Sequence, residues 1–293
     1  MKPAPFNLHL PSAVQDVLSL LAELPGARAI AGGQSFMPML NMRLAMPDDV
    51  IDLNGVKDLS YIREEGDEIV VGAMTRQREL EFSTLIAERL PVVHAGVLNV
   101  GHRQTRNRGT IGGSLCHLDP SAELPALCRL LDAQMVIQSV RGRRVVAASD
   151  FGQGMMTTCL APDELLTEIR FRPWQPGHGW HFVEYARRHG DFAVASAAVM
   201  VARDAAGKLA RASLVVGGVC PVPTRLAEAE RLLVAGNGAP DAIDAAAAQA
   251  AKCEAIEDPA YPGWYRQRLA SRLLRGAVEQ ALARVGGARG EVQ

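Results

Sequence analysis

The chain has 293 residues, of which 48% are hydrophobic and 22% charged, a composition typical of globular proteins with room for two or three domains. Its formal net charge is -1 and 5% of its residues are aromatic, which disfavours nucleic-acid binding. No apolar run approaches the roughly 20 residues of a membrane span, and the N-terminus lacks the apolar core of a signal peptide. We therefore expect a cytoplasmic protein.

The first 57 residues predict a small α/β unit. A helix is expected after a capping box of Ser12 and Gln15, and Pro25-Gly26 ends it. The next expected elements are a buried strand at 28–31, a helix at 36–44 and a buried strand at 50–53. A strand–helix–strand order of this length is typical of parallel strands.

Residues 58–175 predict a larger α+β region. The expected elements are a hairpin over 61–71, a helix from Thr75 to about Leu80, a helix from Pro91, a helix over 123–131, a hairpin over 134–147 and a strand over 164–171. Two prolines and a glycine between Arg172 and Gly177 block regular structure and predict a domain boundary there.

Residues 176–293 predict a third domain of antiparallel strands followed by helices. The expected strands are 180–185, 193–203 and 210–217. The expected helices are 224–234 capped by Thr224, 242–256 capped by Asp241, and an amphipathic helix over 264–285.

The cysteines and histidines do not predict a metal site. None of the five cysteines forms a C-x-x-C pair, whereas an iron–sulfur cluster usually needs four closely spaced thiolates. An odd count in a reducing compartment also makes a disulfide framework unexpected, so we predict buried thiols. His178 and His181 lie between a Pro-Gly turn and a strand, on no shared helical face.

Two glycine pairs followed by small hydroxyl residues are the clearest chemical feature. The segments are Ala31-Gly32-Gly33-Gln34-Ser35 and Thr110-Ile111-Gly112-Gly113-Ser114. Paired glycines let backbone N–H groups approach a ligand without a Cβ in the way, and successive N–H groups form an anion-binding concavity. Neither segment fits a G-x-G-x-x-G or P-loop pattern. Together they predict a pyrophosphate held from two sides, and the alternative is a pair of ordinary tight turns.

The same segments carry a family resemblance. Residues 31–45, the run R-N-R-G-T-I-G-G-S-L at 106–115 and residues 119–125 resemble flavin-binding segments of the FAD (medium) subunits of the molybdenum hydroxylase and xanthine dehydrogenase family. The similarity continues through residues 187–193 to the C-terminal helices. Within this family, the sequence is similar to the carbon monoxide dehydrogenase medium subunit.

This resemblance implies an α+β, FAD-binding fold of the vanillyl-alcohol oxidase type. FAD would lie extended between two α/β subdomains, residues 1–57 and 58–175. Residues 176–293 would form a C-terminal flavoprotein domain with a three-stranded antiparallel sheet and a helix bundle.

The resemblance also assigns roles to residues. Ala31 to Ser35 and Thr110 to Ser114 would hold the pyrophosphate, and Glu123 matches a carboxylate near the ribose hydroxyls. Asp191 and Arg187 lie in the segment that approaches the isoalloxazine, where a cation could stabilise reduced flavin. The alternatives are a helix N-terminal acid for Glu123 and a solvated loop for Asp191 and Arg187. Gln34 and Ser114 depart from the family's usual residues but stay polar.

The function implied is electron transfer within a larger oxidoreductase. A small partner subunit would carry two [2Fe–2S] clusters, and a large one would carry the molybdopterin cofactor and the substrate site. This chain would pass electrons through FAD to an external acceptor, in a dimer of heterotrimers, with no catalytic acid or base of its own. The alternatives are a free-standing FAD oxidoreductase of the same fold and a non-catalytic nucleotide-binding module.

Overall fold

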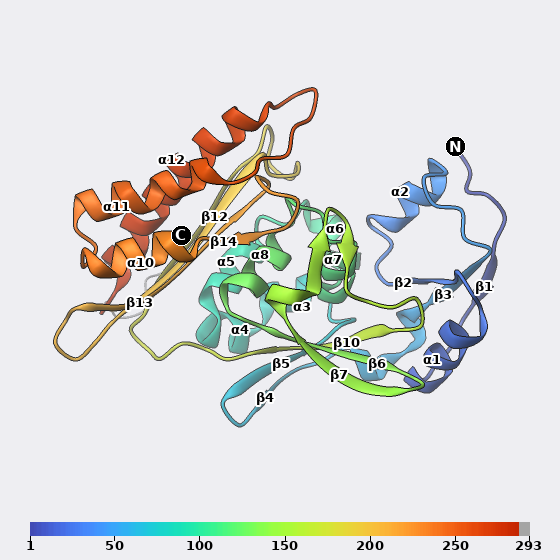
Figure 1. Cartoon of the computed structure of the whole chain (residues 1–293). Helices are drawn as coiled ribbons and strands as arrows, with labels where there is room; N and C mark the ends of the chain where they lie inside the picture. The colour runs from blue at the N-terminus through green and yellow to red at the C-terminus, as the bar shows by residue number, and fades with distance from the viewer. Residues whose placement is uncertain (287–293) are drawn as a thin grey trace.

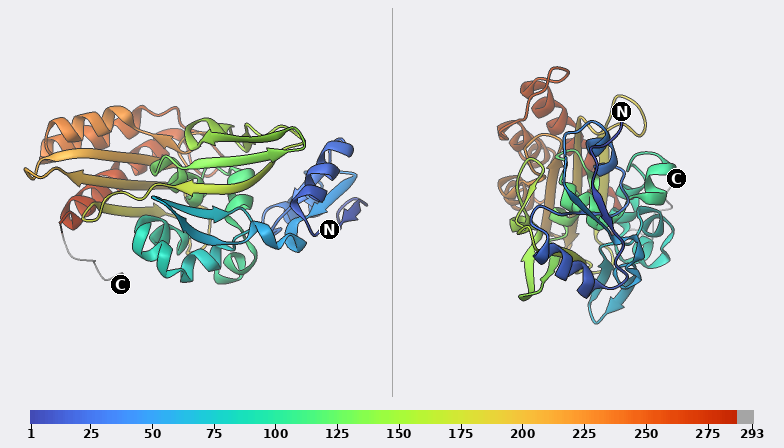
Figure 2. Two further views of the ribbon diagram at one scale, coloured as in Figure 1. Left: turned by 90° about the horizontal axis from the view of Figure 1, so that it is seen from below. Right: turned by 90° about the vertical axis from the view of Figure 1, so that its right-hand side faces the viewer.

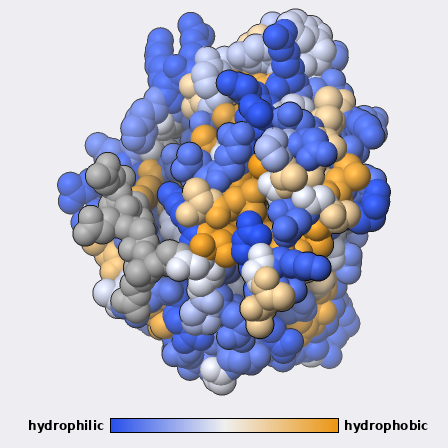
Figure 3. All heavy atoms as spheres, turned by 90° about the vertical axis from the view of Figure 1, so that its left-hand side faces the viewer, coloured by the Kyte–Doolittle hydropathy of each residue, from blue (hydrophilic) through white to orange (hydrophobic). Residues whose placement is uncertain are grey.

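A computed structural model describes residues 1–286, in which three larger sheets follow one another along the chain, with a fourth, two-stranded one beside them (Figure 1). Viewed from below, they lie in a row, with the N-terminal sheet at one end and the C-terminal helices at the other (Figure 2). The end formed by the C-terminal helices is mainly hydrophilic around a central apolar area (Figure 3). Within residues 1–286, no helix combines the length and apolar character that a membrane crossing requires.

The N-terminal part forms a small parallel sheet in the order β1-β3-β2. Its elements are β1 (Asn7–His9), α1 (Val14–Glu23), β2 (Arg28–Ile30), α2 (Phe36–Asn41), β3 (Asp49–Asp52) and the 3-10 turns η1 (Leu53–Gly55) and η2 (Lys57–Leu59). The predicted parallel strand–helix–strand unit is confirmed, with Ala29 opposite Ile51. Val17 and Leu18 of α1 pack with Ile51 in a local apolar core.

Three details of this unit differ from the prediction. Ser12 does not cap α1, because the N-cap is Ala13 and its side chain makes no capping hydrogen bond. β2 lies at the edge of the sheet and is largely exposed rather than buried. The helix expected to reach Leu44 ends at Asn41, and Arg43 then adopts a φ of 56°.

The middle part is a five-stranded antiparallel sheet in the order β4-β5-β10-β6-β7. Its strands are β4 (Ile62–Glu65), β5 (Glu68–Gly72), β6 (Gln134–Ser139), β7 (Gly142–Ala147) and β10 (Leu165–Phe171), with β8 (Gly152–Gly154) and β9 (Thr157–Thr158) paired separately. Its helices are α3 (Gln77–Phe82), α4 (Thr84–Arg89), α5 (Pro91–Val97), α6 (Arg103–Arg108), α7 (Ile111–His117), α8 (Glu123–Leu130) and α9 (Ala148–Phe151). Both predicted hairpins are confirmed.

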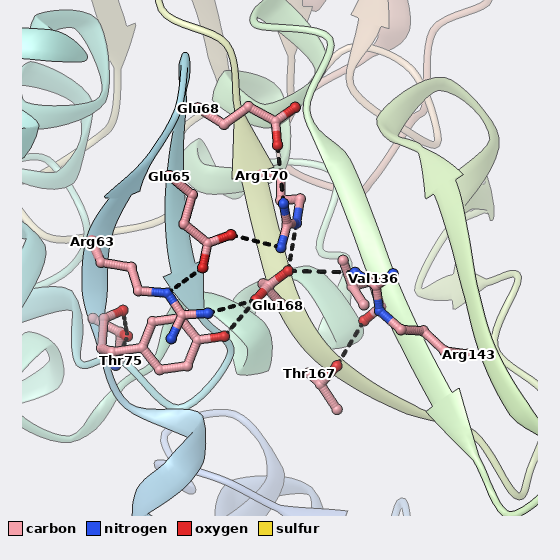
Figure 4. A network of polar contacts seen from close by, with 10 residues as sticks. Arg63, Glu65, Glu68, Thr75, Val136, Arg143, Thr167, Glu168 and Arg170 are labelled. Carbon is pink, nitrogen blue, oxygen red and sulfur yellow. Dashed lines mark hydrogen bonds and ion pairs between the residues drawn. The ribbon is translucent and has the colours of Figure 1, made fainter.

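Helices cover one face of this sheet, and the other face carries ion pairs (Figure 4). Glu168 of β10 accepts hydrogen bonds from Tyr61 Oη and from Arg170 Nε, each at 2.6 Å. Arg170 also contacts Glu65 at 3.0 Å and Glu68 at 3.1 Å. Burial and the neighbouring Glu168 carboxylate raise the pKa of Tyr61 well above its usual value. Because Glu168 is buried, its charge needs such compensation from neighbouring arginines.

The C-terminal part is an antiparallel sheet in the order β11-β12-β13-β14. Its elements are β11 (Gly179–Tyr185), β12 (Ala195–Arg203), β13 (Leu209–Gly217), β14 (Thr224–Arg225), α10 (Ala227–Ala235), α11 (Pro240–Ala247), η3 (Ala248–Lys252) and α12 (Gly263–Arg284). Ala197 and Val199 pack with these helices, whereas Ala198 and Met200 join the core of the middle part. Because successive side chains of β12 point to opposite faces, this strand contributes to both cores and packs the C-terminal sheet against the middle part.

The α+β class is confirmed, and the three long C-terminal strands lie where they were predicted. A fourth, two-residue strand contains Thr224, which therefore does not cap α10. Asp241 lies inside the first turn of α11, whose N-cap is Ala239, and this helix ends at Ala247. The division into domains at residues 57 and 175 stays a prediction, and residues 287–293 lie outside the described part.

Candidate functional site

The two glycine segments lie against each other although they are far apart in sequence. A Cβ placed on Gly32 would lie 2.0 Å from the carbonyl oxygen of Arg108 and 2.8 Å from Gly109 Cα. A Cβ on Gly113 would lie 3.6 Å from Ala31 Cβ. Because backbone meets backbone at Gly32, only glycine fits there.

The first segment is a true loop between β2 and α2. Gly33 has a φ of 74°, the left-handed region that favours glycine. Gln34 folds back, and its Nε2 donates to Gly32 O at 3.3 Å. Within residues 1–286, the amide groups of Gly32, Gly33 and Gln34 have no hydrogen-bond acceptor. Three neighbouring donors are thus available to an anionic ligand.

Asn54 and Arg76 brace this loop, and the sequence did not single them out. Asn54 Nδ2 donates to Ala31 O at 3.0 Å, and Arg76 Nη2 donates to Asn54 Oδ1 at 2.5 Å. Arg76 Nη1 also donates to the carbonyl oxygen of Arg108, two residues before the second segment. One guanidinium therefore ties both segments together. Neither residue belongs to a recognisable motif, since their role depends on contacts between distant parts of the chain.

The second segment is the first turn of a helix rather than a loop. Thr110 is the N-cap of α7, and Gly112 lies so close to Ala73 that a Cβ there would be 2.6 Å from its carbonyl oxygen. Its amides already donate within the chain: Ile111 to Thr75 O, Gly112 to Ala73 O, Gly113 to Thr110 Oγ1 and Ser114 to Thr110 O. Four of the five amides of this segment are therefore already paired, and its role in holding the pyrophosphate stays a prediction. Within residues 1–286, its remaining donors are the amide of Thr110 and the hydroxyl hydrogens of Thr110 and Ser114.

A pair of carboxyl groups lies beyond the second segment. Glu123, the first residue of α8, is 7% exposed, and burial raises its pKa to about 7. The sheet places Glu184 close to the start of α8. Glu184 of β11 lies opposite Ser196 of β12, which lies opposite Gly217 of β13. A Cβ on Gly217 would lie 3.6 Å from the carbonyl oxygen of Pro120, in the loop before α8. Glu184 Oε2 is buried and has no hydrogen-bond partner among residues 1–286. Burial, and secondarily the charge of Glu123, raise the pKa of Glu184 to about 8.

The sequence patterns predicted a role for Glu123 but none for Glu184. The sequence does contain a signal for Glu184. It lies two residues after Phe182 in a predicted strand, so its carboxyl is on the same face as Phe182, which packs against the middle part. A glutamate at such a position is unusual unless it is paired or neutral.

Glu184→Gln is expected to make the stability of the FAD-free chain less dependent on pH. The carboxyl has a raised pKa of about 8 in the folded chain against an ordinary 4.5, so the folded state binds the extra proton between these values. Wild-type stability should fall as pH rises through that range, whereas the amide cannot ionise. The variant should therefore gain stability over the wild type between about pH 5 and pH 9. Urea midpoints across this range measure the difference, with exposed Glu23→Gln as a control. A constant difference at every pH would contradict the expectation.

Arg187 and Asp191 lie on an exposed loop between β11 and β12. Gly190 in this loop has a φ of 87°, and a Cβ there would lie 2.2 Å from the ring of His102. His102 and His189 stack with ring centroids 6.2 Å apart. The loop is thus held beside the start of α6, which leads into the second glycine segment. Among residues 1–286 neither Arg187 nor Asp191 has an ion-pair partner, so the cofactor role and the solvated-loop alternative both stay predictions.

The thiols and other possible ligands are dispersed. In the part of the chain that the structure describes, no group of three or more His, Cys, Asp or Glu side chains is placed to hold a metal ion. All five cysteines are free, and Cys128 and Cys220 are buried. Cys116 is exposed as a residue, although burial of its thiol raises the pKa of that group to about 12.

The fold and the site together define a class of protein. The site has unpaired amides on a glycine loop, a second glycine segment beside that loop, and a buried carboxyl at its border. This arrangement suits a nucleotide cofactor that contains a pyrophosphate. Residues 4–174 match the family model described as the FAD binding domain in molybdopterin dehydrogenase, and residues 180–281 match the CO dehydrogenase flavoprotein C-terminal domain. The chain belongs to this family of FAD-binding flavoproteins.

Individual relatives match over almost the whole chain. The carbon monoxide dehydrogenase medium chain of Afipia carboxidovorans is 39% identical, with 97% of this chain and 99% of the relative covered. The caffeine dehydrogenase subunit beta of Pseudomonas sp. is 36% identical, with 97% of each covered. A solved structure of carbon monoxide dehydrogenase from Hydrogenophaga pseudoflava superposes with a TM-score of 0.94 at 35% identity, covering 97% of this chain and 100% of that one. The expected family, FAD-binding fold and oxidoreductase class are confirmed.

Proposed function

We propose that this chain is the FAD-carrying, electron-transferring subunit of a cytoplasmic molybdenum hydroxylase. The observation that carries the proposal is the match, over 97% of this chain, to subunits of such dehydrogenases. In this chain Gly32 of the first glycine segment lies against Arg108 and Gly109, which directly precede the second. A small subunit with [2Fe–2S] clusters and a large subunit with the molybdopterin cofactor would complete it, as a dimer of heterotrimers that passes electrons to an external acceptor.

The residues present fit FAD. The free amides of the first loop, with Ser35 and the hydroxyls of Thr110 and Ser114, would hold the pyrophosphate. Glu123 would face the ribose, and the loop with Arg187 and Asp191 would face the flavin. Bound FAD supplies a group that accepts and releases electrons. The protein's own part is to hold that group, to exclude water and to set the charge around it.

A spectrum and a pull-down test this proposal. Purified chain should show flavin absorbance, and its absence even after FAD is added would leave only the nucleotide-binding alternative. A native pull-down should bring down subunits that contain iron and molybdenum. Flavin absorbance without such subunits would favour a free-standing FAD oxidoreductase.

Gly113→Val is expected to abolish FAD retention. Its Cβ would lie 2.9 Å from Thr110 Oγ1, and its methyl groups would enter the space between the second segment and Ala31. Flavin absorbance per chain after gel filtration measures the loss. Gly276→Val is a matched control, because nothing lies within 4 Å of the Cβ position of Gly276 in α12. Full FAD occupancy in Gly113→Val would count against the second segment as part of the site.

A further inference from the structure

Two cysteines from separate parts of the chain meet at the edge of the C-terminal core. Cys220 lies shortly after β13, and Cys253 is the residue that ends η3. Cys220 belongs to the apolar core of the C-terminal sheet and helices, and Cys253 packs against that core. Ile256 N donates to Val219 O at 2.7 Å, so the segment after Cys253 runs beside the residue that precedes Cys220. The two thiols are hydrogen-bond partners of each other.

Helix α12 holds the backbone on both sides of this thiol pair. Gln267 Nε2 donates to Cys253 O at 2.7 Å, and Arg266 Nη1 donates to Gly218 O at 2.7 Å. A disulfide forms without strain only between cysteines whose backbones are already close. Two segments fixed to the same helix keep the thiols of Cys220 and Cys253 together, as that bond requires.

The segment that carries Cys220 also reaches the border of the candidate site. Gly218 N donates to Pro120 O at 2.7 Å, in the loop that precedes Glu123. Hydrogen bonds alone join this segment to the residues around Cys253, because both thiols are free. A covalent bond between them would therefore add a new link close to that border.

The hydrogen bond between the thiols makes them chemically unequal. It lowers the pKa of Cys220 to about 7, although burial acts in the opposite direction. The same hydrogen bond, together with burial, raises the pKa of Cys253. Because the thiolate is the reactive form of cysteine, Cys220 has the character of a nucleophile. Cys253 stands beside it as a second thiol, as in pairs that respond to oxidants.

Access to the pair is from the side of Cys253. Cys220 is 7% exposed, whereas Cys253 is half-buried between the exposed residues Lys252 and Glu254. A small oxidant such as hydrogen peroxide can approach along this side, while a bulky disulfide reagent is hindered at Cys220. The geometry thus favours a peroxide over a large thiol-modifying compound.

Neither the other thiols nor a metal ion offers the same chemistry. Burial raises the pKa of Cys116 and of Cys128, so both stay protonated and unreactive at neutral pH. Within residues 1–286, Cys220 and Cys253 have no third His, Cys, Asp or Glu side chain placed to hold a metal ion with them. Two neighbouring thiols without a metal are suited to oxidation.

We propose that Cys220 and Cys253 form a reversible disulfide when the protein meets hydrogen peroxide. The Cys220 thiolate attacks one peroxide oxygen, the O–O bond breaks, and the departing hydroxide takes a proton to become water, which leaves a sulfenic acid on Cys220. The Cys253 sulfur then attacks the Cys220 sulfur. The S–S bond forms, the S–O bond breaks, and the oxygen leaves as a second water with the proton of Cys253.

The electrons balance, because two thiols are oxidised while one peroxide is reduced to two waters. A thiol reductant reverses the link by thiol–disulfide exchange. A disulfide that forms only under oxidising conditions is the kind found in reducing compartments. The oxidant comes from solution, so this inference goes beyond the proposed function and does not depend on bound FAD.

Thiol counting and peptide mapping test the proposal on the full chain. The reduced protein, freed of reductant, is treated with a small excess of hydrogen peroxide in its native state. The number of free thiols, counted after denaturation, should fall by two from the five that the sequence contains. Mapping without reduction should show the Cys220 peptide joined to the Cys253 peptide, and dithiothreitol should restore all five thiols. An unchanged thiol count, a bond between other cysteines or a bond between two chains would overturn the proposal.

Three variants separate the roles of the two thiols. Cys253→Ser removes the second thiol, so peroxide should leave a sulfenic acid on Cys220 that dimedone traps, with no disulfide. Cys220→Ser should give neither product. Cys159→Ser, which changes a cysteine outside the pair, is the matched control and should form the Cys220–Cys253 bond as the wild type does. Dimedone on another cysteine of Cys253→Ser, with Cys220 unmodified, would contradict the assignment of the nucleophile. If a serine variant fails to fold, the wild-type peptide map still decides whether the bond forms.

Discussion

Gly32→Ala is expected to remove FAD from the protein and to lower its free energy of unfolding by about 2 kcal/mol. The new Cβ would lie 2.0 Å from the carbonyl oxygen of Arg108 and 2.6 Å from its carbonyl carbon. Backbone cannot turn aside as a side chain can, and this carbonyl is also held by Arg76. The two segments would have to separate, and the donors of the first loop would then no longer face the second segment.

Equilibrium binding of FAD and thermal unfolding measure the effect of Gly32→Ala. Gly113→Ala should be milder, because its Cβ meets only the Thr110 hydroxyl within 3 Å, and a side chain can yield. Gly276→Ala, which meets nothing, should leave FAD binding unchanged and raise stability slightly, because alanine favours the interior of helix α12 over glycine. If Gly32→Ala binds FAD as tightly as the wild type, the contact between the two segments does not shape the site.

The sequence predicted most of the fold because its strands are strongly patterned. β12 and β13 are long runs of small and β-branched residues, and the hairpins around Gly66 and Gly142 have turns that need positive φ. The parallel unit around the first glycine loop was also recoverable, since strand, loop and helix follow one another within a short stretch.

Capping was predicted poorly, and the reason is physical. Ser12, Thr75 and Thr224 were each expected to start a helix, and none does. Thr75 Oγ1 instead donates to Tyr61 O at 2.9 Å and accepts from Tyr61 N at 3.1 Å. A hydroxyl beside a helix start competes for distant backbone partners, which a local pattern does not contain.

The candidate site was recoverable only in part for the same reason. The glycine pairs are local signals, and they marked both segments. Three features of the site depend on tertiary contacts. They are the hydrogen bonds of Asn54 and Arg76, the burial of the Glu184 carboxyl, and the hydrogen bonds that the amides of the second segment donate to other parts of the chain. The glycine pair at 112–113 predicts a tight turn, whereas both residues lie in helix α7 and Gly112 allows this helix to pack closely on Ala73.

Arg266→Ala is expected to destabilise the protein by about 3 kcal/mol, because it leaves two buried carbonyl groups without a donor. Arg266 is 5% exposed, and its Nη1 donates to Val194 O and to Gly218 O, each at 2.7 Å. Its Nη2 pairs with Asp258 in the loop before α12. One side chain thus joins α12 to the ends of two loops, and one of those loops carries Arg187 and Asp191.

The same substitution should weaken FAD binding beyond its effect on stability, if the loop of Arg187 and Asp191 faces the flavin. Urea unfolding of the FAD-free chain gives the first quantity, and FAD titration well below the unfolding midpoint gives the second. Arg275→Ala is the matched control, since Arg275 lies on the same helix but in an exposed pair with Asp244, and exposed pairs contribute little. Arg266→Lys should rescue only in part, because an ammonium cannot span both carbonyls and the carboxylate as the planar guanidinium does. Loss of stability with unchanged FAD affinity would mean that Arg266 holds the C-terminal sheet alone and that the loop lies away from the cofactor.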